Sequence, residues 1–154
     1  MRTERGATLM ELLIAAGIVA VLGVVSVLGA QQLSNSYRVR AAARQVMSDF
    51  QFARVSAVKE GRTWAVCFTP GDTAVTSYRI INDPAGCASA SPPVRTTNLS
   101  GFPGVAVAEN FTGTSVAFGS QGTATPTGTM TMTSPDGART LTVSLGAAGN
   151  PRIQ

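Results

Sequence analysis

The hydrophobic and polar positions follow three successive patterns along the chain. Residues 12–30 contain no charged side chain, and these roughly 19 residues would form about 28 Å of helix, close to the ~30 Å hydrocarbon core of a bilayer. From residue 31 to residue 61 the apolar positions recur at steps of three and four, and beyond residue 61 they alternate with a period of two. This order predicts a membrane-spanning helix, an amphipathic helix that continues it, and a domain built from strands.

The two helical segments are expected to form one helix, because no proline occurs between Ala7 and Pro70. Gly61 is its predicted C-terminal stop. A helix from Ala7 to about Glu60 would be roughly 80 Å long, so its first half needs lipid or other subunits to cover it. Its second half carries one apolar stripe that we expect to pack on the downstream domain: Val39, Ala43, Val46, Phe50, Ala53 and Ala57.

Downstream, the alternating pattern predicts short strands over 63–68, 77–81, 105–108 and 114–119. Pro70-Gly71-Asp72 is a predicted turn, and the region 82–104, rich in Pro, Ser, Ala and Gly, is a predicted loop.

The clearest strand signal is a hairpin formed by residues 127–133 and 140–145. Ser134-Pro135-Asp136-Gly137 between them fits a type I turn. Its candidate core residues are Met130, Met132, Leu141, Val143 and Leu145. A long N-terminal helix followed by an antiparallel sheet is an α+β fold, with the helix packed on the sheet.

The charged residues distinguish the helix from the domain. Residues 31–62 contain six arginines and lysines but only two acids, Asp49 and Glu60. From residue 63 onward the numbers are equal, with four arginines and four acids. A neutral domain has no broad electrostatic footprint for nucleic acid. Arg38, Arg40 and Arg44 could meet anionic headgroups or acidic residues of neighbouring subunits, or simply form a solvated helix face.

Histidine is absent from the chain. Its absence excludes Ser-His-Asp triads, Cys-His pairs and histidine metal sites. We therefore expect no catalytic residue, no cofactor and no metal, and a membrane-anchored exported enzyme is the weakest of the functional hypotheses.

Glu11 stands at the edge of the apolar segment, where a carboxylate costs on the order of 2.5–3.5 kcal/mol and is a functional-site hypothesis by default. Arg2 and Arg5 precede the segment, so the positive-inside rule keeps this end in the cytoplasm and predicts export of the rest. One alternative is a secretory signal cleaved after Leu28-Gly29-Ala30, which leaves Glu11 unexplained. Another is a glutamate that merely snorkels to the headgroups.

Cys67 and Cys87 are the only cysteines. In an exported domain they would form a disulfide that closes a loop of about 20 residues and contributes roughly 3 kcal/mol. Two buried free thiols are the alternative.

The stretch Arg5-Gly6-Ala7-Thr8-Leu9-Met10-Glu11-Leu12-Leu13 resembles the class III signal of type IV pilins and pseudopilins. The resemblance implies that a prepilin peptidase cuts between Gly6 and Ala7 and methylates the new amine of Ala7. Glu11 then pairs with the Ala7 amine of a neighbouring subunit. Ala7 departs from the phenylalanine that the family usually has there. The implied organisation is a leader over 1–6, a transmembrane and assembly helix over 7–30, an amphipathic helix over 31–61 and a β-sheet domain over 62–154.

Three further stretches resemble the FimT-like minor pilins and the H-type pseudopilins of type II secretion: residues 40–45, 51–59 and 64–68. This resemblance implies a non-catalytic subunit that helps to initiate or cap a type IV pilus or a type II secretion pseudopilus. Its partners would be the prepilin peptidase, other pilin or pseudopilin subunits and inner-membrane lipid. It would cross the bacterial inner membrane once, with a cytoplasmic N-terminus and a periplasmic domain.

The C-terminal residues Gly149-Asn150-Pro151-Arg152 bear on the alternative function, a filament-tip module that contacts DNA or a secreted partner. FimT-like proteins of competent bacteria can bind DNA through a Gly-Arg-x-Arg tail, and only Gly149 and Arg152 match that pattern. One arginine in a neutral domain supplies too few phosphate contacts. An ordinary tail that closes the sheet is the favoured expectation.

Overall fold

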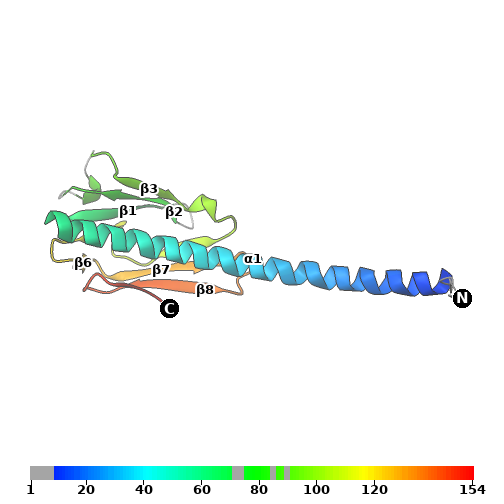
Figure 1. The fold of residues 1–154 in the computed structure, drawn as a ribbon. Helices are drawn as coiled ribbons and strands as arrows, with labels where there is room; N and C mark the ends of the chain where they lie inside the picture. Colours follow the sequence, from blue (N-terminus) through cyan, green and yellow to red (C-terminus); the bar gives the residue numbers. More distant parts are fainter. Residues whose placement is uncertain (1–8, 71–74, 84–85, 89–90) are drawn as a thin grey trace, which may run out of the picture. The chain divides into compact units, whose positions relative to one another are not determined.

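The computed structural model describes residues 9–70, 75–83, 86–88 and 91–154, with the backbone but not the side chains of residues 24–32, 70 and 88. The chain divides into two compact units, Met1–Ser34 and Asn35–Gln154. One long helix, α1 (Leu9–Glu60), contributes to both (Figure 1).

The C-terminal end of α1 shows why the helix stops where the sequence predicts. Gly61 has a φ of 62°, a left-handed conformation that glycine adopts without strain. The N–H of Arg62 reaches back to the carbonyl of Ala57 over 3.2 Å, the hydrogen bond of a Schellman cap.

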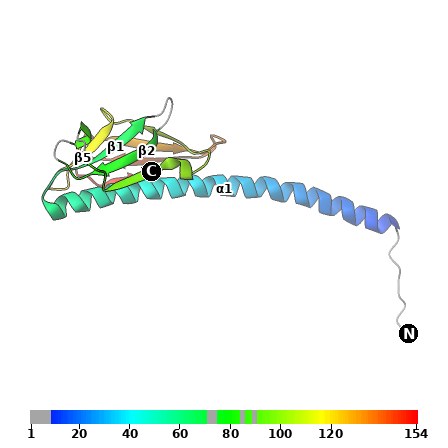
Figure 2. The same cartoon turned by 90° about the horizontal axis from the view of Figure 1, so that it is seen from above.

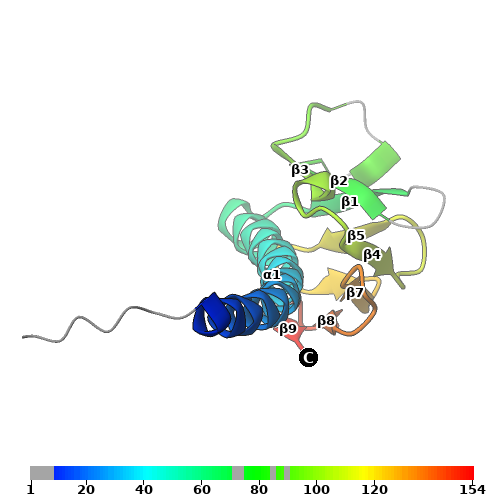
Figure 3. The ribbon, with the colours of Figure 1, turned by 90° about the vertical axis from the view of Figure 1, so that its right-hand side faces the viewer.

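In the second unit, two antiparallel sheets lie on the same side of α1, which runs along them (Figures 2 and 3). The five-stranded sheet has the order β3-β2-β1-β5-β6. Its strands are β1 (Trp64–Pro70), β2 (Val75–Ile81), β3 (Arg95–Asn98), β5 (Ser115–Phe118) and β6 (Ala124–Thr125). The four-stranded sheet has the order β4-β7-β8-β9. Its strands are β4 (Ala106–Glu109), β7 (Gly128–Thr133), β8 (Thr140–Leu145) and β9 (Pro151–Ile153).

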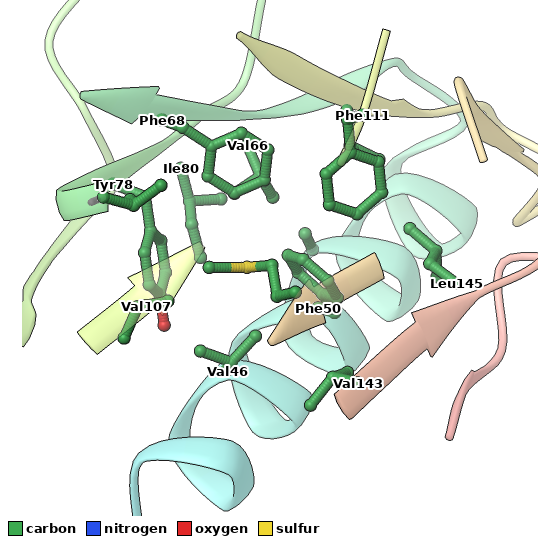
Figure 4. Close-up of a cluster of buried hydrophobic side chains, with 14 of the residues drawn as sticks. Val46, Phe50, Val66, Phe68, Tyr78, Ile80, Val107, Phe111, Val143 and Leu145 are labelled. Atoms are coloured by element: carbon green, nitrogen blue, oxygen red, sulfur yellow. The ribbon is translucent and has the colours of Figure 1, made fainter. Parts of the chain in front are cut away.

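The core lies between α1 and the two sheets, and Phe50 is at its centre (Figure 4). The ring of Phe50 lies 6.1 to 6.4 Å, centroid to centroid, from three phenylalanines of the sheet side, close enough for edge-to-face contacts. All six residues of the predicted apolar stripe are buried. The stripe therefore does what the helical pattern predicts.

The predicted hairpin is confirmed. β7 pairs with β8 from Gly128–Leu145 to Thr133–Thr140, and the N–H of Gly137 bonds to the carbonyl of Ser134 across the turn. Four of the predicted hairpin core residues are buried and Leu141 is partly buried. The expected closure of the sheet by the tail is also confirmed, because β9 pairs with β8.

Two expectations need correction. The strands form two sheets instead of one, and the predicted loop over 82–104 contains β3 and two short 3-10 helices, Gly86–Ala88 and Leu99–Gly101. Residues of β3 are mostly exposed because it is an edge strand, so the Arg-Thr-Thr-Asn sequence has no apolar alternation to reveal it. The predicted turn at 70–72 lies outside the described residues except for Pro70, the last residue of β1.

Candidate assembly site

The first unit presents an apolar helical surface. Between residues 9 and 23 of α1, nine large hydrophobic side chains are each 56% to 77% exposed: Leu9, Met10, Leu12, Leu13, Ile14, Ile18, Val19, Val21 and Leu22. They surround the helix instead of lying on one face. A helix that is apolar all round requires lipid or protein on every side, so this segment is built to be covered.

Glu11 lies in the first turn of α1, among these apolar side chains. Gly6 and Ala7, the predicted cleavage site and amine, lie outside the described residues, so the predicted pair between Ala7 and Glu11 stays a prediction. Part of the predicted transmembrane segment, residues 7–8 and the side chains of 24–30, lies outside them as well. Within the described part of the chain, no helix is both long enough and apolar enough to cross a membrane.

The second unit holds a fully buried carboxylate, Asp49, on the inner face of α1. Its Oδ1 accepts a hydrogen bond from Arg95 Nη1 at 2.7 Å. Its Oδ2 accepts hydrogen bonds from the Tyr78 hydroxyl at 2.8 Å, from Thr97 Oγ1 at 2.7 Å and from Gln45 Nε2 at 3.1 Å. These four donors come from α1, β2 and β3, so the carboxylate joins the helix to two strands.

Burial raises the pKa of Asp49, but the hydrogen bonds from Thr97, Tyr78, Arg95 and Gln45 outweigh it and leave the pKa below its usual range. Burial and the nearby negative charge of Asp49 raise the pKa of Tyr78 well above its usual range. The carboxylate is therefore ionised and the phenol is a permanent donor. This pairing is suited to a fixed structural contact and not to proton transfer near neutral pH.

Arg95 extends the cluster to the surface. Its guanidinium lies 4.5 Å from the centre of the Phe52 ring, within range of a cation–π contact, and Phe52 meets Trp64 edge to face at 5.7 Å. The side chain of Arg95 is 44% exposed, whereas that of Asp49 is inaccessible. The ion pair is thus exposed to solvent only from the arginine side.

The sequence analysis did not identify the role of Asp49. A signal was present, because Asp49 continues the step from Val46 toward Ala53 within the buried stripe. A lone acid at a core-facing helical position requires buried donors.

The predicted disulfide between Cys67 and Cys87 is confirmed, with the two Cα atoms 5.6 Å apart. It links β1 to the short 3-10 helix at Gly86–Ala88. Cys67 packs with Ala65 and Ile81 in a small second cluster of buried side chains.

Arg152, the candidate DNA contact of the alternative function, is exposed on β9 opposite Ser144. It borders a shallow hollow of about 470 Å³ whose other lining residues are uncharged. The hollow therefore offers one positive charge, fewer than a DNA backbone normally requires.

Comparisons with known proteins agree with this architecture. The sequence model of the family described as Type II transport protein GspH matches residues 42–149, more than half of the chain. A search of curated proteins finds no match.

Solved structures share the fold. The type IV minor pilin FimU of Pseudomonas aeruginosa strain PAO1 is similar at a TM-score of 0.58 and 22% identity, over 75% of this chain and 91% of FimU. A second crystal form of FimU has the same score over 79% and 90% of the two chains. The minor pseudopilin EpsH of the Type 2 Secretion System of Vibrio cholerae is similar at a TM-score of 0.58 and 12% identity, over 76% and 96%.

The family match covers α1 from residue 42 onward and the strands β1 to β8, and the fold neighbours share this fold. This protein belongs to the family described as Type II transport protein GspH, and it shares its fold with the minor pilin FimU and the minor pseudopilin EpsH.

Proposed function

We propose that the protein is a minor subunit that helps to initiate or cap a type IV pilus or a type II secretion pseudopilus. It is anchored in the bacterial inner membrane by residues 7–30, with its N-terminus in the cytoplasm and its strand domain in the periplasm. The observation that carries this proposal is the exposed apolar surface of α1 between residues 9 and 23.

The energetic reason is the hydrophobic effect. Covering each of the nine exposed side chains contributes about 1 to 2 kcal/mol, which together is ample to drive association with lipid or with neighbouring helices. Lipid covers the segment before assembly, and the helices of other subunits cover it in the filament.

The polar part of the proposal concerns Glu11. A prepilin peptidase cuts between Gly6 and Ala7 and methylates Ala7, which leaves a positive amine at the start of the mature chain. In the filament, the Glu11 carboxylate of one subunit pairs with the Ala7 amine of its neighbour. Each charge relieves the desolvation of the other, so the pair stabilises the assembly, and removing one partner strands a buried charge.

The experiment compares Glu11→Ala and Glu11→Asp with the wild type in cells that assemble the filament. We expect Glu11→Ala to be exported and processed after Gly6 but to be absent from sheared filaments, because the amine loses its partner. Glu11→Asp keeps the charge and should be incorporated at least in part. Mass spectrometry of the N-terminus checks cleavage and methylation, and equal incorporation of Glu11→Ala and wild type would refute the ion-pair account.

A further inference from the structure

The outer face of α1 in the second unit carries positive charge without matching negative charge. At 100° per residue, Arg40, Arg44, Val55 and Val58 fall within about 60° of one another around the helix, on the side opposite Asp49. All four are exposed, and Lys59, which is also exposed, lies one helical turn beyond Val55. We call these five residues the basic stripe; it extends over about 28 Å of helix.

The stripe borders two hollows that combine the same kinds of side chain. The first, of about 210 Å³, is lined by Arg40, Arg44, Leu141 and Ile153. The second, of about 420 Å³, is lined by Arg54, Val55, Val58 and Lys59. Each hollow therefore combines two aliphatic side chains with two cations, and the pattern occurs twice along one helix face.

Among the described residues, the three cations of the basic stripe have no partner within the subunit. Arg54, which lines the second hollow but is not one of the five residues of the stripe, donates to the carbonyl of Gly122. The described part of the chain offers no hydrogen-bond or ion-pair partner to Arg40, Arg44 or Lys59. Arg40 and Arg44 are one helical turn apart, a like-charge spacing that disfavours the isolated helix. Val55 and Val58 are 61% and 51% exposed, so apolar area and charge are both available to a partner.

A second copy of this chain is poorly suited to be that partner. The acids that the structure describes in the second unit are isolated along the chain, more than ten positions from one another, and Asp49 is fully buried: Asp49, Glu60, Asp83, Glu109 and Asp136. Two copies placed with their stripes together would juxtapose like charges, which suppresses association.

We propose that the basic stripe is the contact surface for a different filament subunit, one that presents carboxylates on both sides of an apolar surface. This inference rests on the proposed function and names the kind of partner. Complementary charge fixes the register and selects an unlike neighbour over a like one. The apolar side chains of the two hollows, Leu141, Ile153, Val55 and Val58, supply the area that excludes water around the pairs.

The test uses the full chain in detergent, mixed in turn with each other pilin-like subunit of the same cell, and measures binding at low and high salt. We expect one subunit with an acidic face to bind, and Arg40→Glu/Arg44→Glu to weaken that binding about tenfold or more. Lysine substitutions of the partner's acids should restore binding to the charge-reversed variant. Arg79→Glu/Arg139→Glu has the same charge change at exposed sites elsewhere and should bind as the wild type does.

A second variant, Val55→Ser/Val58→Ser, should weaken binding without changing its salt dependence, because it removes only apolar contact. Circular dichroism and thermal melts check that each variant is folded. Equal binding by charge-reversed variant and wild type would overturn the proposal. Self-association that is lost in the charge-reversed variant would also overturn it. The same holds if the protein binds only vesicles rich in phosphatidylglycerol and the charge-reversed variant does not bind them.

Filament fractions separate this inference from the proposed function. If the wild type and Arg40→Glu/Arg44→Glu are found in sheared filaments in equal amounts, the contact through the basic stripe is refuted, but the role as a filament subunit is not. Wild type absent from filaments refutes the subunit role itself, and with it the contact.

Discussion

Tyr78 donates its hydroxyl hydrogen to Oδ2 of Asp49 over 2.8 Å, and both side chains are fully buried. The two residues belong to β2 and α1, so this bond ties an inner strand of the five-stranded sheet to the inner face of the helix.

Replacing Tyr78 with phenylalanine removes one donor from a buried carboxylate and should lower the free energy of unfolding by about 1 to 3 kcal/mol. Urea unfolding of the full chain in detergent, followed by the fluorescence of Trp64, measures the change. Tyr37→Phe is the matched control, because Tyr37 is 68% exposed and should change stability little. Equal stability of the two variants would show that the Tyr78–Asp49 bond is not stabilising.

The low pKa of Asp49 makes stability depend on pH. Its folded-state pKa lies below the ordinary value of 3.8, so the stabilisation is complete above the ordinary pKa and is lost as the pH falls through the folded-state pKa. Unfolding free energies between about pH 2 and pH 6 should fall steadily at the acid end. Asp49→Asn should be much less stable than wild type at neutral pH, and the difference should narrow at acid pH.

Asp136→Asn is the control for this titration. The pKa of Asp136 is also lowered, by hydrogen bonds from Ser134 and the Ala138 N–H, but its carboxylate is at the surface. Replacing Asp136 should leave most of the decrease in the free energy of unfolding at acid pH unchanged. A gap between wild type and Asp49→Asn that stays constant over the whole range would contradict the assignment to Asp49.

The Cys67–Cys87 disulfide should stabilise the domain by about 3 kcal/mol, because it closes a loop of 20 residues. The double variant Cys67→Ala/Cys87→Ala should lose this amount in urea unfolding and become insensitive to reductant. Wild type treated with reductant should approach the stability of the variant. Mass spectrometry under non-reducing conditions provides the direct check, and two free thiols in protein taken from the periplasm would contradict the bond.

Arg152 allows a test of the DNA-binding alternative. Its hollow is otherwise lined by uncharged residues, so we expect no salt-sensitive shift of duplex DNA by the full chain in a gel mobility assay. Arg152→Ala should behave as the wild type does. A shift that weakens steeply with salt and disappears in Arg152→Ala would favour the tip module that contacts DNA.

The elements that the sequence predicts well are those with local causes. The apolar stripe from Val39 to Ala57, the stop at Gly61 and the hairpin around Pro135 depend on residues within a few positions of one another. Periodicity, a positive φ and turn chemistry act over that range, so the helix and the hairpin were predicted almost residue by residue.

The strand β3 was missed for the opposite reason. Its residues Arg95 and Thr97 are polar because their partner is the carboxylate of Asp49, 46 and 48 positions earlier in the chain. A strand whose polar side chains donate to one buried acid has no apolar alternation by which the sequence could reveal it. The reason for these polar residues is evident only in the folded structure, where α1 and β2 lie beside β3.

Interactions between residues that are near in the sequence determine some features of this protein, and contacts between distant residues determine the others. Local sequence is sufficient for a long apolar helix with a glutamate in its first turn, and for the family to which the chain belongs. The division of the strands into two sheets, the four donors around Asp49 and the unbalanced cations of the basic stripe depend on packing between distant segments. Packing of distant segments decides which side chains are buried together. It therefore determines whether a charged side chain has a partner within the subunit or stays exposed to a neighbouring one.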